Sequence, residues 1–477
     1  MKKPKQRRGS LSVIEKYSYG IGCLGSNMIY GIIATFGMIY LTDEVKLPAG
    51  FVGTMFFAAK FWDAVNDFIM GMIVDNTHTR FGKFKPWILA GTLSSSAVLI
   101  WFFSPWNVSL ETAMLVATIA YVAWGMTFTM FDISYWSMLP NLAQDPKERE
   151  QISVIPRIFA IIGSTVIVGG FGIPIIKSLG GGQTGYSRFA WIIAAMFIIS
   201  SLITVLGIRN QDNRIKTEDT KEKVKKERTT LKDAFRAVIR NDQLIVAIVI
   251  ILTFNFALSF AQGGLLYFFK YVSGNENLFS YYTLAQGAAV ALGLIVYPKL
   301  VSTLSRRTVY LWAGIFPAAG MVILFIGSFI VPESAVVAVV SGFVFAIGQG
   351  LQLGSVTVFL ADTVDYGEYK LGKRNESVTF SCQTLLTKFA SALSTMLVGW
   401  CLTMTGYVPN SVQSEATLMG IRIVSIVLPA VFALISMVVF LKFMKLDRET
   451  VEDILKELKM RQNEKKKEMS RTDKAVV

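Results

Sequence analysis

Long apolar runs, separated by short polar segments, recur along almost the whole chain. Each run is about 20 residues or longer, which is the length an α-helix needs to cross the hydrocarbon core of a bilayer. The pattern therefore predicts an all-α integral membrane protein with twelve transmembrane helices. The predicted spans are 19–41, 50–74, 87–106, 112–139, 153–177, 187–208, 243–272, 279–300, 309–331, 335–361, 378–403 and 420–444.

One long polar interruption divides the predicted spans into two sets of six. It contains the charged run from Lys221 to Arg228, so we expect a solvated cytoplasmic linker. Basic loops recur at matching positions, with Lys83 after the second span and Arg306 after the eighth. Two pseudo-symmetric six-helix bundles are the organisation of the major facilitator fold. The predicted parts are a cytoplasmic N-terminal segment (1–18), a first bundle (19–208), the linker (209–242), a second bundle (243–444) and a cytoplasmic tail (445–477).

The positive net charge of the chain bears on its partners and on its orientation in the membrane. The 477 residues carry a net charge of +14, which in a soluble protein would suggest nucleic-acid binding. Because 53% of the residues are hydrophobic and the basic residues gather in alternate loops, the positive-inside rule explains the charge instead. We therefore expect no nucleic-acid partner and a lipid bilayer as the surroundings. The loop charges predict a multi-pass protein of the cell membrane with both termini in the cytoplasm.

Two acidic side chains, Asp63 and Asp67, lie one helical turn apart inside the second predicted span. A charge near the centre of such a helix costs about 2.5–3.5 kcal/mol on insertion scales, so two acids in the same helical phase indicate a function. The spacing also places Asn66 on this face. Clustered carboxylate and amide oxygens suit a small cation, which makes the chain a candidate ion-coupled transporter.

A second polar stripe lies on the fourth predicted span, where Thr129, Asp132 and Trp136 are three and four residues apart. A carboxylate accepts hydrogen bonds from sugar hydroxyls, and an indole ring stacks on the apolar face of a pyranose. A lone Trp in a membrane helix usually packs or anchors the helix at the interface. The acid one turn earlier favours a sugar subsite.

The remaining polar side chains within the spans have two interpretations each. Arg157 and Lys388 either only neutralise the acids or also bind the ligand. Lys60, one turn before the first acid, is either its counter-ion or a gate residue. Gln383 and Thr384 either fill the site or form hydrogen bonds between helices.

A separate group of charges ends the tenth predicted span. The acids Asp362 and Asp365 are followed closely by basic residues that include Arg374. At the cytoplasmic boundary, such a group is typical either of a salt-bridge gate or of a solvated loop. These residues are not expected to bind the substrate.

Several segments resemble the melibiose permease family, the glycoside–pentoside–hexuronide:cation symporter branch of the major facilitator superfamily. The similar segments are Trp62 to Asp67, Arg80 to Trp87, Trp124 to Asp132, Glu148 to Gln151 and Ala361 to Glu368. The resemblance extends from about residue 14 to 445 and passes through both halves in order.

The resemblance implies roles for particular positions. It assigns a cation (Na⁺) site to Asp63, Asn66, Asp67 and Thr129. It assigns sugar binding to Asp132, Trp136, Arg157, Gln383, Thr384 and Lys388. The chain departs from the family in the first helix, where Asn27 stands in place of a sugar-binding acid. Asn27 can form hydrogen bonds to hydroxyls but carries no charge, so glycosides, pentosides and hexuronides all stay open as substrates.

We therefore expect a secondary active transporter that imports a sugar or glycoside with a monovalent cation by alternating access. Sodium is preferred as the coupling ion, protons or lithium are alternatives, and no other cofactor is expected. A functional monomer is expected. The alternative is a membrane sugar sensor of the same fold, although the charged tail after Leu446 is short for a signalling domain. An enzyme would need a nucleophile with a base, or a metal cluster, which the predicted spans do not offer.

Overall fold

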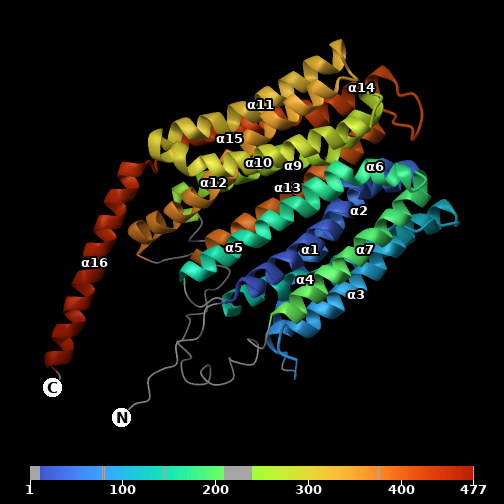
Figure 1. Ribbon diagram of the computed structural model, residues 1–477. Coiled ribbons are helices and arrows are strands. Elements are labelled where there is room, and N and C mark those ends of the chain that lie inside the picture. Colours follow the sequence, from blue (N-terminus) through green and yellow to red (C-terminus); the bar gives the residue numbers. More distant parts are fainter. Residues whose placement is uncertain are drawn as a thin grey trace. The chain divides into compact units, whose positions relative to one another are not determined.

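The computed structural model describes residues 11–77, 79, 81–142, 146–208, 239–372 and 376–475, and every regular element in these ranges is a helix (Figure 1). The predicted linker therefore lies mostly outside the described residues. The helices before it are α1 (Val13–Ile39), η1 (Tyr40–Glu44), α2 (Ala49–Asp75), α3 (Lys85–Phe102), α4 (Leu110–Leu142), α5 (Pro146–Ile161), η2 (Ile162–Gly170), α6 (Phe171–Ser178) and α7 (Gly182–Gly207). The helices after it are α9 (Asp242–Tyr267), η4 (Phe268–Val272), α10 (Asn277–Thr303), α11 (Arg306–Ile330), α12 (Ala335–Leu371), α13 (Glu376–Met404), α14 (Glu415–Arg422), η5 (Ile423–Val427), α15 (Leu428–Phe443) and α16 (Arg448–Ala475).

The segments η1, η2, η4 and η5 are π-helical turns that continue their α-helical neighbours as single rods. Counted in this way, ten helices in the described ranges are long and apolar enough to cross a membrane. They do not include α2, which carries Lys60, Asp63 and Asp67 along its length, or α3. Ten of the twelve predicted spans are thus supported, and α2 and α3 stay predictions.

The contacts of the chain divide it into two compact units. The first comprises 1–225, 262–287 and 395–421, and the second comprises 226–261, 288–394 and 422–477. The boundaries predicted for the two six-helix bundles stay predictions.

In the first unit, α1 packs against α5, η2 and α7, while α3 packs against α4 and α7 (Figure 1). Small residues make these close contacts possible, as is usual for helices in membranes. A Cβ atom added to Gly25 on α1 would lie 1.9 Å from Ser200 Oγ on α7, and one added to Gly91 on α3 would lie 2.5 Å from the backbone nitrogen of Phe131 on α4. Of direct importance for the site, α2 packs against α4.

In the second unit, α11 packs against both α12 and α15. The tail forms a 28-residue helix, α16, which contacts α12. The sequence predicts a cytoplasmic tail here, but Val451, Ile454 and Leu458 are buried in an apolar cluster with Phe359 and Phe440. The spacing of these side chains places them on one face of α16, so this face docks on the unit while the charged faces remain in solvent.

Candidate cation and sugar site

In the middle of α2, the polar side chains point into the protein, while several neighbouring apolar side chains point out. Asp63 and Asn66 are 9% and 8% exposed, whereas Phe61, Val65 and Phe68 are all more than half exposed. This arrangement is the reverse of that in a soluble helix, and it is the one expected when polar residues of a membrane helix face the bundle interior. The predicted polar face of α2 is therefore directed at α4.

Asp63 and Asp67 meet α4 in a matched register. The Oδ1 atom of Asp63 lies at Gly125, where an added Cβ would be only 2.4 Å away. One turn further along both helices, Thr129 donates a hydrogen bond from its Oγ1 to Asp67 Oδ1 at 3.0 Å. Because both contacts advance in the same direction, the two helices run parallel here and keep both acids against one stripe of α4.

The side-chain amide of Asn66 lies between these two contacts along α2. Its Nδ2 is buried and has no hydrogen-bond partner among the described residues. Rotation of the amide by half a turn exchanges its nitrogen and oxygen, which are distinguished only by their hydrogen bonds. With the oxygen in the orphaned position, a cation would satisfy it. Three of the four predicted cation ligands, Asp63, Asp67 and Thr129, thus lie at the α2–α4 contact, and the oxygens of all four have the chemistry that suits a small hard cation.

Lys60 supplies a positive charge at the same place. Its Nζ lies 3.2 Å from Asp63 Oδ2 and 5.7 Å from the centre of the Tyr30 ring on α1. The side chains of Lys60 and Asp63 are 17% and 12% exposed, so the pair is largely shielded from water. Of the two interpretations of Lys60, the counter-ion is the one that the geometry supports.

Two of the predicted sugar residues of the first half, Asp132 and Trp136, continue the same α4 stripe. Trp136 donates a hydrogen bond from Nε1 to Asp132 Oδ1 at 3.1 Å, and its ring is 39% exposed. The hydrogen bond orients both groups, and Trp136 remains partly exposed. Asn27 on α1 donates to the backbone oxygen of Cys23 at 2.9 Å, and Arg157 on α5 is exposed.

The predicted sugar residues of the second half lie on α13, within the second unit. Gln383 and Lys388 are half-buried there, and Thr384 is exposed. Their participation in the same sugar site stays a prediction.

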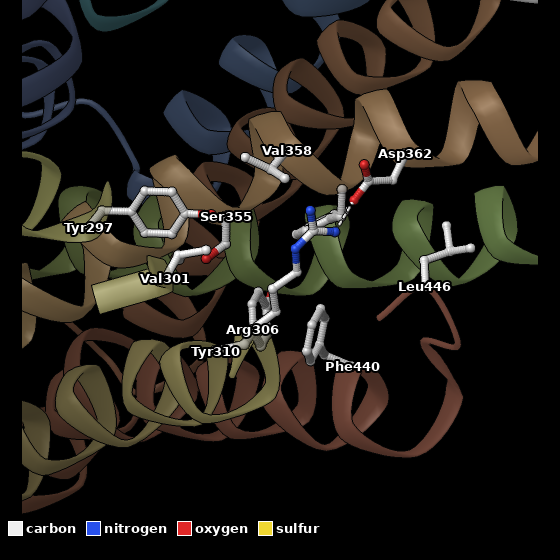
Figure 2. A pocket seen from close by; sticks show the side chains of 10 residues that line it. Tyr297, Val301, Arg306, Tyr310, Ser355, Val358, Asp362, Phe440 and Leu446 are labelled. Atoms are coloured by element: carbon white, nitrogen blue, oxygen red, sulfur yellow. Dashed lines mark hydrogen bonds and ion pairs between the residues drawn. The ribbon is translucent and has the colours of Figure 1, made fainter. Parts of the chain in front are cut away.

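The predicted gate has a different set of partners from those expected. Asp362 pairs with Arg306 at the start of α11, with 2.5 Å between Nη1 and Oδ2. Arg374 lies outside the described residues, and Lys370 pairs with Asp242 on α9. Arg306 and Asp362 line a small cavity of about 20 Å³. Figure 2 shows the Arg306 guanidinium pointing at Asp362. The cavity is lined by Tyr297, Val301, Arg306, Tyr310, Ser355, Val358, Phe359, Asp362, Phe440 and Leu446.

Sequence reasoning missed a buried polar network around Asp43 on η1, an acid whose side chain is 1% exposed. Its carboxylate accepts hydrogen bonds from Lys270 and Tyr271 on η4, both at 2.5 Å, and from Thr42 at 2.9 Å. Tyr407, in the segment between α13 and α14, also donates to it.

This Asp43 network joins three parts of the first unit that are far apart in the sequence. Burial, together with the charge of Asp43, raises the pKa of the Tyr407 hydroxyl well above its ordinary value, so Tyr407 stays a donor. The network could have been predicted from the positions of its two charged residues in the sequence. Asp43 lies just after the end of the first predicted span and Lys270 lies near the end of the seventh, which are similar places in two repeated halves.

The known proteins with similar sequences include several that are named as sugar transporters. Lactose permease of Lactobacillus helveticus is 29% identical over 94% of this chain and 72% of its own length. The isoprimeverose transporter of Lactiplantibacillus pentosus is 28% identical over 91% of this chain and 89% of its own. A putative sulfoquinovose importer of Escherichia coli (strain K12) is 28% identical over 98% and 97% of the two chains.

Solved structures share the fold. A bacterial homolog of the human lysosomal transporter Spinster, in an inward-facing and unoccupied conformation, has a TM-score of 0.65 at 15% identity, covering 91% of this chain and 96% of that chain. The nucleoside transporter NupG has a TM-score of 0.60 at 14% identity, covering 89% and 99%. These likenesses confirm the major facilitator fold, and the sequence relatives confirm the resemblance to sugar symporters. Residues 18–448 match the protein family described as "MFS/sugar transport protein". This multi-pass chain therefore belongs to that family of transporters and is not an enzyme.

Proposed function

We propose that this transporter carries a sugar or glycoside into the cell together with a monovalent cation. The observation that supports the proposal is the matched register of α2 and α4. It places Asp63 and Asp67 beside Gly125 and Thr129, and the same α4 stripe continues to Asp132. A cation site and a sugar subsite on one stripe of one helix are the arrangement that coupled transport needs. The relatives carry different sugars in their names, so they support sugar transport without selecting the sugar.

In the cation half, the ion would be held by oxygens of Asp63, Asn66, Asp67 and Thr129. We prefer sodium because carboxylate, amide and hydroxyl oxygens are hard ligands. Lithium is an alternative with the same ligand preference. Two nearby carboxylates could also share a proton, which is the third alternative.

In the sugar half, Asp132 would accept hydrogen bonds from hydroxyls while the Trp136 ring stacks on the apolar face of the sugar. Asn27 would add an uncharged hydrogen-bonding group from α1. Arg157, with Gln383, Thr384 and Lys388, is proposed to complete the sugar site. The protein is proposed to act as a monomer in the cell membrane, with both termini in the cytoplasm.

Coupling would pass along α4, because Thr129 and Asp132 are less than one turn apart. A cation that orders Thr129 also orders the acid of the sugar site, so each ligand favours binding of the other. Transport follows if the empty and doubly loaded forms interconvert between the outward-facing and inward-facing conformations and the singly loaded form does not.

The test is uptake by proteoliposomes that contain the purified protein. A thermal-unfolding screen of glycosides, pentosides and hexuronides, each with and without sodium, selects the labelled substrate. Uptake is then measured under an imposed sodium, lithium or proton gradient. The double variant Asp63→Asn with Asp67→Asn should lose accumulation, and Glu111→Gln, at the exposed start of α4, should keep it.

Each outcome has a separate meaning. Accumulation that follows a gradient in the native protein and is lost in the double variant supports the proposal. Accumulation by the double variant would reject the cation site. Sugar binding without any uptake would favour the membrane sugar sensor.

A further inference from the structure

Lys60 occupies one side of the Asp63 carboxylate, to which the proposed cation would bind. Its ammonium nitrogen lies 3.2 Å from Asp63 Oδ2, and both side chains are largely buried. The other carboxylate oxygen, Oδ1, lies against the backbone of α4 at Gly125. The accessible edge of Asp63 is therefore the one to which the ammonium is bound.

A cation at this edge and the ammonium of Lys60 would repel each other. Two unit charges within a few ångströms interact strongly in a site that is shielded from water. The cation would also need the oxygen that the ammonium holds. Both arguments imply that cation binding and the Lys60–Asp63 contact exclude each other.

We infer that Lys60 is a tethered competitor of the transported cation, an inference that rests on the proposed function of the α2–α4 site. Without the cation, the ammonium substitutes for it at Asp63. When the cation binds, Lys60 leaves Asp63 and its ammonium is held over the Tyr30 ring. Lys60 thus sets the cation concentration at which the site loads.

The displaced ammonium has an aromatic surface ready to receive it. Its Nζ is already 5.7 Å from the centre of the Tyr30 ring, a distance at which the ring attracts a cation. Tyr30 is backed by Trp124 and Phe128 of α4, at ring-centre distances of 6.0 and 5.8 Å. A small change of rotamer therefore moves Lys60 from the acid to the ring.

The same movement offers a link to the sugar. Tyr30 lies three residues after Asn27 on α1, so the two side chains share a face of this helix. Phe128 is the neighbour of Thr129 on α4. The ring that would receive the ammonium thus shares a face of α1 with Asn27 of the proposed sugar site, and loading the cation alters the surroundings of this ring.

A plain counter-ion makes a different prediction. If Lys60 only neutralises an Asp63 that takes no part in cation binding, its removal should lower the unfolding temperature without making cation binding tighter. If Lys60 competes, its removal should lower the cation concentration needed for half-saturation. The two roles are therefore separated by the cation dependence and not by stability alone.

The experiment uses the purified full-length protein in detergent at pH 8. The unfolding temperature is followed during titration with sodium chloride and, separately, lithium chloride, with choline chloride keeping the ionic strength constant. Lys60→Gln should reach half-saturation at a concentration lower by roughly ten-fold or more. Lys60→Arg, which keeps the charge, should stay close to the native protein. Tyr30→Leu, which removes the receiving ring, should need roughly three-fold more cation, and it tests the inference even if Lys60→Gln does not fold.

The outcomes distinguish this inference from the proposed function. A native protein that responds to sodium, with Lys60→Gln unchanged or weaker, overturns the inference and leaves the cation site standing. A response seen only in Lys60→Gln supports the inference and shows that Lys60 replaces the cation in the native protein, which overturns coupling. No response in any variant rejects the cation site and, with it, the inference. In the supporting cases, Asp63→Asn added to Lys60→Gln must abolish the response.

Discussion

The Asp43 network predicts an unequal pair of destabilising substitutions. Asp43→Asn keeps the size of the side chain and leaves the ammonium of Lys270 without its acid. Lys270 is 22% exposed and keeps a 2.9 Å hydrogen bond to Asn410, so it retains some solvation. Lys270→Met instead leaves a carboxylate that is 1% exposed without its counter-charge. Removing one partner of a buried ion pair costs about 3–5 kcal/mol, and the difference in exposure decides where each variant falls.

We expect Lys270→Met to lower the free energy of unfolding by about 3–5 kcal/mol and Asp43→Asn by roughly 2–3 kcal/mol. The double variant should cost less than the sum, because neither charge is then left alone. The free energies are measured by reversible unfolding in mixed micelles with increasing sodium dodecyl sulfate. The control is Lys177→Met, which breaks a pair with Glu276 whose side chains are 45% and 28% exposed. Its expected cost is below about 1 kcal/mol.

Two results would refute this reasoning. The first is a change of less than roughly 0.5 kcal/mol in both single variants, because the network would then not behave as a buried pair. The second is a larger loss for Asp43→Asn than for Lys270→Met, because the less exposed charge must suffer more when it is left unpaired.

Three further predictions follow from the site and the tail. Gly125→Ala places a methyl group 2.4 Å from the carboxylate of Asp63 and should weaken cation binding by roughly ten-fold in a sodium titration. The control is Gly71→Ala, whose added methyl group meets nothing within 4 Å and should leave cation binding unchanged. Trp136→Phe keeps a stacking ring but removes the hydrogen bond to its acid, so sugar affinity should fall by about three- to ten-fold in equilibrium binding, and Trp136→Ala should lose more. Hydrogen bonds from the hydroxyl and from the backbone N–H of Thr450 hold the pKa of Asp447, which caps α16, below its ordinary value. Asp447→Ala should therefore destabilise the start of α16 by about 1 kcal/mol in hydrogen exchange. Because the folded-state pKa is the lower one, the stabilisation is present above the unfolded-state pKa and is lost as the pH falls through the folded-state pKa. Equal protection of the start of α16 at pH 7 and at a pH below the folded-state pKa, each corrected for the intrinsic exchange rate, would contradict this.

Helix positions were predictable because the signal for each one is local. A bilayer demands about 20 apolar residues, and a helix satisfies its own backbone within that segment. The charges of α2 weaken this signal, which is why α2 is missing from the ten helices apolar enough to span. The docking of α16 was not predictable, because its few apolar residues gain meaning only against the surface formed by α12 and α15.

For the site, the sequence by itself determined which side chains share a helical face, because the helical repeat places Asp63 with Asp67 and Thr129 with Asp132. Only the tertiary structure decided which faces meet. Gly125 carries no chemical signal, yet it decides how closely Asp63 approaches α4. Asp43 and Lys270, 227 residues apart, are paired by the packing of helix ends. The physical reason is that helix periodicity is a property of neighbouring residues, whereas helix packing depends on the shapes of surfaces distant in the chain.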